Sequence, residues 1–163
     1  MILTLIIALL ILLNLLVELT MVGVSIVFLV WELDRKRKGR GFLDDMWAMG
    51  AVLLMLLVGH LVQMALWAGS FIWCGEFDSF QTAFYHSSVN YASLGYGDIV
   101  MSEEWRLLGG LEAAVGVMMF GVSAALLFAM LSKLIRIHFV ETLGWRPGDH
   151  GAERPRDRDQ SAG

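Results

Sequence analysis

Residues 93–98 read Ser-Leu-Gly-Tyr-Gly-Asp, and this stretch constrains the fold more than any other in the chain. Two glycines flank one aromatic residue, and glycine adopts backbone angles that other residues resist. Consecutive carbonyl groups can therefore point to one side, where they can replace the water shell of a cation. Irregular backbone of this kind is tolerated at membrane depth only where protein surrounds it or where it lines a water-filled path.

Residues 79–91 precede this stretch and favour a short helix. Asp78 and Ser79 are both suitable N-caps, because a short polar side chain can accept a hydrogen bond from the first turn. The helix is too short to cross a membrane. A half-span helix followed by a glycine-rich return predicts a re-entrant loop, with a pore helix over 79–91 and an ion-binding filter over 93–98.

Three long apolar blocks surround this loop, over residues 1–31, 46–73 and 106–137. The 163 residues are 57% hydrophobic and 17% charged, whereas soluble domains carry about a quarter charged residues. This composition excludes ordinary cytosolic enzymes, secreted disulfide scaffolds and nucleic-acid-binding domains, and the single cysteine cannot form an intrachain bridge. Each block can form a helix that crosses the roughly 30 Å hydrocarbon layer. We therefore expect an all-α membrane protein with three transmembrane helices.

The charges between and after these blocks predict the orientation of the chain. Residues 32–45 include a basic run over 34–40, and Lys and Arg concentrate in cytoplasmic loops. The N-terminus is then expected outside, together with the acidic segment 74–105, which has no lysine or arginine. Residues 138–163 have mixed charge and no apolar period, which favours a cytoplasmic, largely disordered tail. No basic residue precedes the first block and no cleavage pattern follows it, so we expect a retained helix and not a signal peptide.

The run over 83–98 resembles the pore helix and selectivity filter of tetrameric potassium channels, whose filter commonly reads Thr-Val-Gly-Tyr-Gly-Asp. The similarity continues downstream, because Trp105-Arg106 begins the following helix and Gly116 falls where the family has a hinge glycine. Phe120-Gly121 match the pattern beyond that hinge. Over residues 46–137 the resemblance implies a potassium-channel-like pore domain that assembles fourfold, with the first block as an added helix.

The resemblance also implies which groups hold the ion. Main-chain oxygens of the filter and the Ser93 hydroxyl are the expected ligands of K⁺, and no cofactor besides the permeating ion is expected. One chain offers one arc of carbonyls, whereas a cation must be surrounded, so we expect a homotetramer in the cell membrane, of the bacterial inner-membrane type. Passive conduction needs no covalent chemistry, so neither catalysis nor a nucleic-acid partner is expected. The filter residues are Ser93, Leu94, Gly95, Tyr96 and Gly97.

Two filter residues depart from the family's pattern. Ser93 replaces the usual threonine and keeps the hydroxyl, whereas Leu94 replaces a β-branched residue and packs differently behind the filter. Selectivity for K⁺ over Na⁺ is expected. A weakly selective cation channel is the first alternative, and a non-conducting membrane scaffold or accessory subunit is the second.

Two pore-helix positions that support the filter also depart from the pattern. Val89 stands where many relatives have a glutamate, so a carboxylate contact with Asp98 is absent. His86 stands where relatives often have a tryptophan that bonds the filter aspartate. We expect His86 to bond Asp98 and to make filter stability depend on pH near 6 to 7. Exposure of His86 to outside water is the alternative.

Polar side chains occur inside the first two apolar blocks. Asn14 and Glu18 lie one turn apart in the first block, and His60 and Gln63 lie one turn apart in the second. Antiparallel neighbours would pair Glu18 with His60 and Asn14 with Gln63, because polar groups in hydrocarbon need partners. We expect these pairs to clamp the first helix to its own or a neighbouring pore domain. A protonation switch at a buried Glu–His pair is the alternative.

The third block contains candidates for a support and for a gate. Glu112 is a functional candidate as an intramembrane carboxylate, or it bonds the back of the pore helix at Asn90 or Tyr91. A ring of Phe128 would form a constriction that closes by dewetting, and a lipid-facing Phe128 is the alternative. Helical spacing from the hinge glycine Gly116 predicts the pore-lining and gate candidates Val117, Phe120 or Gly121, Ala124, Phe128 and Ser132.

Overall fold

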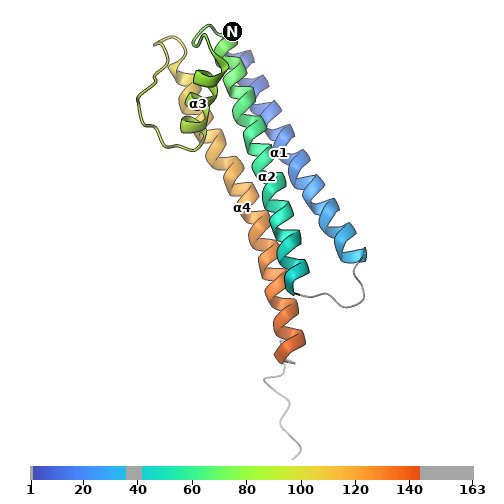
Figure 1. Cartoon of the computed structure of the whole chain (residues 1–163). Helices are drawn as coiled ribbons and strands as arrows, with labels where there is room; N and C mark the ends of the chain where they lie inside the picture. The colour runs from blue at the N-terminus through green and yellow to red at the C-terminus, as the bar shows by residue number, and fades with distance from the viewer. Residues whose placement is uncertain (1, 36–41, 144–163) are drawn as a thin grey trace, which may run out of the picture. The chain divides into compact units, whose positions relative to one another are not determined.

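The computed structural model describes residues 2–35 and 42–143, which form four helices and, within those ranges, no strand (Figure 1). Their bounds are Ile2–Arg35 for α1, Phe42–Trp73 for α2, Phe80–Tyr91 for α3 and Arg106–Leu143 for α4. Three of them contain spans long and apolar enough to cross a membrane, namely Ile7–Glu32, Leu43–Trp73 and Arg106–Arg136. The prediction of an all-α membrane fold with three long helices and one short helix is confirmed.

The long helices extend beyond their predicted ends. Helix α1 continues to Arg35 instead of residue 31, and α2 begins at Phe42 instead of residue 46, so residues 32–35 and 42–45 of the predicted loop are helical. Residues 36–41 and 144–163 lie outside the described part of the chain.

Helix α4 extends into the tail over 138–163 that was predicted to be largely disordered, most of which lies outside the described residues. It continues to Leu143, so residues 138–143 are helical. A hydrogen-bonded helix propagates until a residue interrupts it. No glycine or proline occurs between Gly121 and Gly144, so nothing in this interval favours an earlier end.

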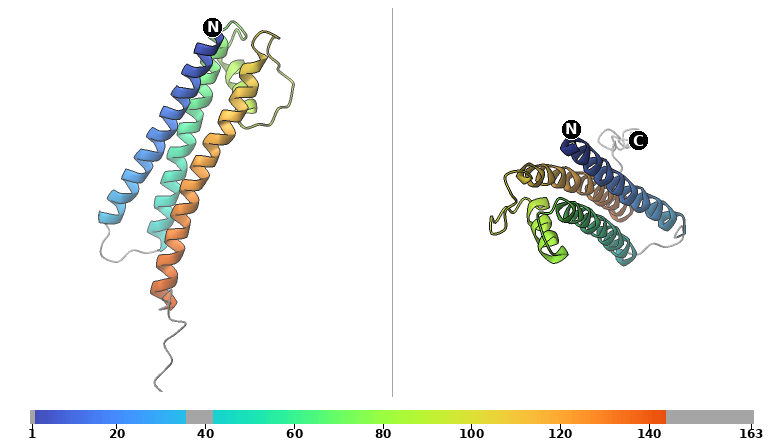
Figure 2. Two further views of the ribbon diagram at one scale, coloured as in Figure 1. Left: turned by 180° about the vertical axis from the view of Figure 1, so that it is seen from behind. Right: turned by 90° about the horizontal axis from the view of Figure 1, so that it is seen from above.

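The chain divides into two compact units, Met1–Phe128 and Ala129–Gly163. The first unit contains α1, α2, α3 and the first part of α4. In this unit α1 runs antiparallel to α2, and α3 lies beside the C-terminal end of α2 (Figures 1 and 2). The predicted filter, residues 93–98, and its predicted supports His86 and Val89 therefore belong to the first unit, and α3 is the predicted pore helix.

The core of the first unit surrounds the C-terminal end of α3. Trp67 and Phe71 of α2, Tyr91 of α3 and Leu108 of α4 are fully buried, and Leu10 of α1 joins the same cluster. Elsewhere the long helices expose large apolar side chains to their surroundings. In a bilayer these side chains face lipid tails, which are as apolar as the side chains themselves. Contacts between the helices then depend on close packing and on buried hydrogen bonds.

Candidate functional site

Helix α3 begins at a side-chain cap and ends directly before the filter. Ser79 is the N-cap, with extended φ and ψ of −130° and 141°, and its Oγ accepts a hydrogen bond of 3.2 Å from the Thr82 amide. Of the two predicted caps, Ser79 is therefore the one used. At the other end, the Ser93 amide donates a hydrogen bond of 2.7 Å to the Asn90 carbonyl. This bond turns the chain out of the helix and into the filter.

The filter backbone alternates between positive and negative φ. Ser93, Gly95 and Gly97 have φ of 56°, 57° and 73°, whereas the intervening Leu94 and Tyr96 are not among the positive-φ residues. When left-handed and right-handed residues alternate, the rotation at one peptide cancels the rotation at the next, and successive carbonyl oxygens project to the same side. The described backbone therefore has the pattern that a row of aligned carbonyls requires.

Ser93 is the one non-glycine residue with positive φ in the described part of the chain. A residue with a Cβ in the left-handed region costs about 1–2 kcal/mol. Such strain persists where surrounding contacts hold it, and it concentrates at functional sites. Ser93 is held at the junction of the pore helix and the filter by the hydrogen bond that its backbone N–H donates to the Asn90 carbonyl oxygen.

Val89 supports the filter through its main chain. Its carbonyl accepts a hydrogen bond of 2.8 Å from the Leu94 amide and a longer one of 3.5 Å from the Gly95 amide. The Val89 side chain is buried. Val89 has no carboxylate to contact Asp98, but its backbone carbonyl holds the start of the filter stretch.

In the single chain the filter itself lies open. Every residue from Ala92 to Asp98 is exposed, and the large side chains of Leu94 and Tyr96 are 55% and 67% exposed. Irregular backbone at membrane depth would need a further surface to cover it. One chain therefore leaves the predicted filter stretch 93–98 uncovered.

Tyr85, and not His86, bonds Asp98. The Tyr85 hydroxyl donates a hydrogen bond of 2.7 Å to Asp98 Oδ2. This bond is the main cause that lowers the pKa of Asp98 and raises the pKa of Tyr85. The predicted His86–Asp98 hydrogen bond is therefore wrong. Successive residues of a helix project about 100° apart, so only one of these two neighbours can face the end of the filter.

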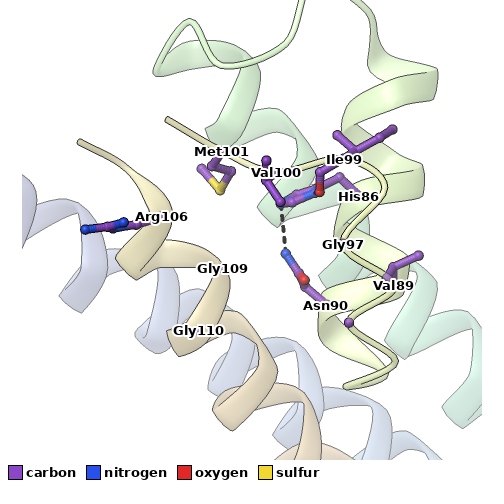
Figure 3. Close-up of a pocket in the computed structure, with 11 residues that line it drawn as sticks. His86, Val89, Asn90, Gly97, Ile99, Val100, Met101, Arg106, Gly109 and Gly110 are labelled. Atoms are coloured by element: carbon purple, nitrogen blue, oxygen red, sulfur yellow. Dashed lines mark hydrogen bonds between the residues drawn. The ribbon is translucent and has the colours of Figure 1, made fainter. Parts of the chain in front are cut away.

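His86 instead holds the chain just after the filter. Its Nδ1 lies 3.1 Å from the Ile99 carbonyl oxygen, and its Nε2 lies 2.8 Å from Asn90 Nδ2 (Figure 3). A carbonyl only accepts and an amide NH₂ only donates, so Nδ1 carries the hydrogen and the ring is neutral. Burial lowers the pKa of His86, against opposite effects of the Ile99 bond and of the charges of Asp98 and Glu76. His86 is 5% exposed, so the alternative of a water-exposed ring is also wrong.

A pocket of about 400 Å³ lies behind the filter, where α3, the chain after the filter and α4 meet (Figure 3). The backbone of two filter glycines forms part of its wall, so no side chain of the same subunit fills the space directly behind them. The filter is thus held at its two ends and is loosely supported between them. The lining residues are His86, Val89, Asn90, Gly95, Gly97, Ile99, Val100, Met101, Arg106, Gly109 and Gly110.

Glu76 holds the chain between the filter and α4. Its carboxylate accepts hydrogen bonds of 2.8 Å and 2.6 Å from the amide and hydroxyl of Ser102. In the sequence Glu76 is one acidic residue of the segment 74–105, and nothing in the pattern indicates this role. The partner lies 26 residues away, and no spacing rule connects such positions.

Gly116 lies where α4 crosses the end of α3. A Cβ at Gly116 would lie 2.1 Å from the Tyr91 carbonyl oxygen, which is far too close for two non-bonded atoms. The absence of a side chain is therefore required for close packing of the two helices. Helix α4 runs through this residue without interruption. The role of Gly116 as a hinge stays a prediction.

The pore-lining candidates of α4 differ in what they face. The Phe120 ring contacts the rings of His60 and Tyr91 at centroid distances of 4.5 Å and 5.4 Å, so it packs within its own subunit. This contact favours Gly121 over Phe120 as the pore-facing alternative. A role in lining or closing a pore stays a prediction for the other candidates, all exposed in the single chain: Val117, Gly121, Ala124, Phe128 and Ser132.

The four polar residues predicted to pair between α1 and α2 are buried, but their predicted pairing is wrong: Asn14, Glu18, His60 and Gln63. Gln63 Nε2 donates a hydrogen bond of 2.9 Å to Glu18 Oε2, so Glu18 contacts Gln63 and not His60. Asn14 Nδ2 donates to the Leu10 carbonyl of its own helix at 2.8 Å and does not bond Gln63. The two helices are shifted by about one turn relative to the alignment expected from their lengths alone.

Tyr91 and Ser123 complete this polar group and were not predicted in it. The Tyr91 hydroxyl donates a hydrogen bond of 2.6 Å to Gln63 Oε1 and lies 3.1 Å from His60 Nδ1. Ser123 Oγ donates to Glu18 Oε1 at 2.7 Å. One buried group of hydrogen bonds thus joins α1, α2, α3 and α4.

Glu112 bonds the back of the pore helix, as one of its two interpretations predicted. Its carboxyl group is fully buried and hydrogen-bonds the hydroxyl of Ser87, a turn earlier in α3 than the predicted partners Asn90 and Tyr91. Ser87 Oγ also lies 2.9 Å from the Met64 carbonyl oxygen of α2. Ser87 and Glu112 therefore join the pore helix to both long helices that flank it.

A comparison with protein families matches residues 51–133 to a family model described as an ion channel. The matched region begins in α2, contains α3 and the filter, and ends in α4. It covers 83 of the 163 residues, because 133 − 51 + 1 = 83, and α1 lies outside it. No curated protein and no solved structure matches the chain.

Proposed function

Because the chain belongs to the ion channel family whose pore unit has two transmembrane helices, we propose that it is a passive, potassium-selective channel. Four copies would surround one conduction path, and K⁺ ions would cross the filter without their water shell. The alternating backbone of Ser93, Gly95 and Gly97 carries this proposal, because it favours carbonyl oxygens that line one side of the chain.

The open filter supports assembly from several copies. A single row of carbonyls contacts only one side of an ion, and the energetic cost of dehydration is offset only when oxygens surround it. The exposed Leu94 and Tyr96 side chains point to a further protein surface beside the filter. Identical copies around one axis would supply both the missing oxygens and this covering surface. The alternative of a non-conducting scaffold would leave the filter conformation without a role.

The orientation that we propose follows from the charges. The basic run over 34–40 would lie in the cytoplasm, with the N-terminus and residues 74–105 outside the cell membrane and the C-terminus inside. In this orientation the C-terminal end of α3, which carries about half a negative charge, would point from outside toward the middle of the membrane. Four such ends would stabilise a cation below the filter.

A weakly selective cation channel is the second candidate, and two observations favour it. Leu94 lacks the β-branching that is usual at its position, and the pocket behind Gly95 and Gly97 leaves the filter without a packed support. A loosely held filter discriminates less well between K⁺ and Na⁺ where selectivity depends on cavity size. The flux ratio of the two ions distinguishes this candidate from the first.

Ion flux through the purified protein in liposomes tests the proposal. We expect flux for K⁺ that exceeds flux for Na⁺, and a particle that contains four chains. Gly95→Ala should abolish K⁺ selectivity, because a Cβ at φ of 57° disturbs the carbonyl row. Gly75→Ala is the matched control, since Gly75 also has positive φ, at 77°, but lies in a turn outside the filter. Absence of cation flux, or equal effects of both substitutions, would contradict the proposal.

A further inference from the structure

We propose that Glu18 of the added helix α1 is a positioning residue for the filter, which acts through Gln63 and Tyr91 on the end of the pore helix. The proposal rests on the proposed channel function, because it concerns how well the filter discriminates between ions. It assigns α1 a part in conduction, although this helix lies outside the matched channel region 51–133.

The contacts form an unbroken chain from α1 to the pore helix. Glu18 Oε2 accepts from Gln63 Nε2 at 2.9 Å, and Gln63 Oε1 accepts from the Tyr91 hydroxyl at 2.6 Å. The other carboxylate oxygen, Oε1, accepts from Ser123 Oγ at 2.7 Å. Glu18, Gln63 and Tyr91 are each at most 1% exposed, so water does not replace these bonds.

The hydrogen bonds that link Tyr91, Gln63 and Glu18 all donate in the direction of Glu18. The Tyr91 hydroxyl has one hydrogen and gives it to Gln63, so the hydrogen between His60 Nδ1 and the Tyr91 oxygen must come from His60. Gln63 accepts at one end of its amide and donates at the other. A carboxylate only accepts, and hydrogen bonds that run in one direction polarise and strengthen one another. Glu18 is therefore the acceptor on which the orientation of Gln63 and Tyr91 depends.

Tyr91 is the residue through which this chain reaches the filter. It is the last residue of α3, two positions before the strained Ser93. Its carbonyl oxygen packs directly against Gly116, and its ring contacts Phe120 of the same helix. The end of the pore helix is thus held by α4 on one side and by the Gln63–Glu18 bonds on the other. A displaced Tyr91 would shift the first carbonyls of the filter.

The pore unit does not supply the common acceptor itself. Gln63 and Ser123 both lie within the matched region 51–133, and both donate to a carboxylate that comes from α1. Removal of Glu18 would leave two buried donors in a membrane without an acceptor, and side chains in that situation reorient to find one. Gln63 is the side chain whose reorientation releases Tyr91.

The test measures the K⁺/Na⁺ permeability ratio of purified, reconstituted channels that have been shown to be assembled. We expect Glu18→Leu and Tyr91→Phe to lower the ratio by about threefold to tenfold, the factor given by the net free energy of one hydrogen bond. Glu18→Gln should retain most of the ratio, because its amide oxygen can still accept from Gln63. Asn14→Leu is the matched control, since Asn14 is equally buried on the same helix but bonds only its own backbone.

A double substitution tests whether the residues act through one another. If Tyr91→Phe is added to Glu18→Leu, the ratio should fall no further than in either single variant. Additive losses, or a ratio for Glu18→Leu and Tyr91→Phe equal to that of Asn14→Leu, would overturn the proposal. If Glu18→Leu does not assemble, Tyr91→Phe and Glu18→Gln still decide the question. Absence of cation flux in the unmodified protein would instead contradict the proposed function.

Discussion

The Tyr85 hydroxyl donates a hydrogen bond of 2.7 Å to Asp98 Oδ2 and so joins the pore helix to the last residue of the filter stretch 93–98. Both groups are exposed in the single chain, and the bond crosses from the middle of α3 to the far end of the glycine-rich stretch. Together with the Val89 carbonyl at the filter's start, it holds the two ends of a segment whose middle has an open pocket behind it.

The first prediction concerns this bond. Tyr85→Phe should raise the pKa of Asp98 toward its ordinary value, because the Tyr85 bond is the main cause that lowers it. A lowered carboxyl pKa contributes stability that is fully present at neutral pH and is lost only as pH falls through the folded pKa. At pH 7 the variant should therefore show faster loss of current during sustained conduction. Recordings of current decay measure this effect, and Asp98→Ala, which removes the acceptor of the Tyr85 bond, should reproduce it.

The second prediction concerns pH and His86. Its pKa lies below the ordinary histidine value of 6.5 because burial disfavours the charged ring. The folded protein therefore binds fewer protons than the unfolded chain at pH values between these two pKa values. The contribution of His86 to the free energy of unfolding should be constant above about pH 6.5 and should decrease as the pH falls below that value. Thermal unfolding of the assembled protein from pH 5 to 8 measures this dependence.

Two substitutions connect that pH dependence to His86. His86→Phe should weaken it. Asn90→Asp should also make the decrease smaller, because a carboxylate beside Nε2 stabilises the protonated ring and raises the pKa of His86 toward 6.5. The pH interval over which the unfolded chain binds more protons than the folded protein is then narrower. An unchanged pH profile in His86→Phe would show that another group titrates.

The third prediction concerns the segment between the filter and α4. Glu76→Ala should lower the free energy of unfolding by about 1 kcal/mol, because two hydrogen bonds to Ser102 are lost at a partly exposed site. Glu103→Gln is the control: its side chain is 93% exposed and lies 3.8 Å from Arg106, and exposed ion pairs contribute little. Chemical denaturation of both variants measures the difference, and equal losses would count against a role for Glu76.

The fourth prediction concerns Gly116. Gly116→Ala should lower the free energy of unfolding by about 1–3 kcal/mol or prevent assembly, because its Cβ would meet the rigid Tyr91 carbonyl at 2.1 Å. Gly121→Ala in the same helix has no atom within 4 Å of its Cβ. It should be neutral or stabilise the helix by about 1 kcal/mol. A hinge role alone would predict altered opening in Gly116→Ala with unfolding unchanged, which thermal unfolding beside current recordings can distinguish.

The outline of the fold was predictable because it depends on local signals. Long apolar runs identify membrane helices, Ser79 marks the start of α3, and glycines at 95 and 97 mark the backbone that needs positive φ. These features act within a few residues of the chain. The helix ends at Arg35, Phe42 and Leu143 were less predictable, because a helix can continue beyond the apolar span that indicates it.

The partners of the buried polar residues were not predictable in the same way. Glu18 was expected opposite His60 and lies opposite Gln63, and Asp98 was expected to bond His86 and bonds Tyr85. Each difference corresponds to a small rotation or shift of one helix against another. A sequence lists which groups need partners, but such shifts depend on the packing of all the side chains between the helices.

Membrane-crossing helices and a glycine-rich return can be predicted from the residues alone, because hydropathy and backbone freedom are properties of the residues themselves. The Tyr91 bond to Gln63, the close packing at Gly116 and the Glu76 bonds to Ser102 are visible only in the folded chain. Those relationships join residues far apart in the chain, and contact between them depends on the relative placement of helices to within about an ångström, since hydrogen bonds weaken steeply outside a narrow range of distance and angle.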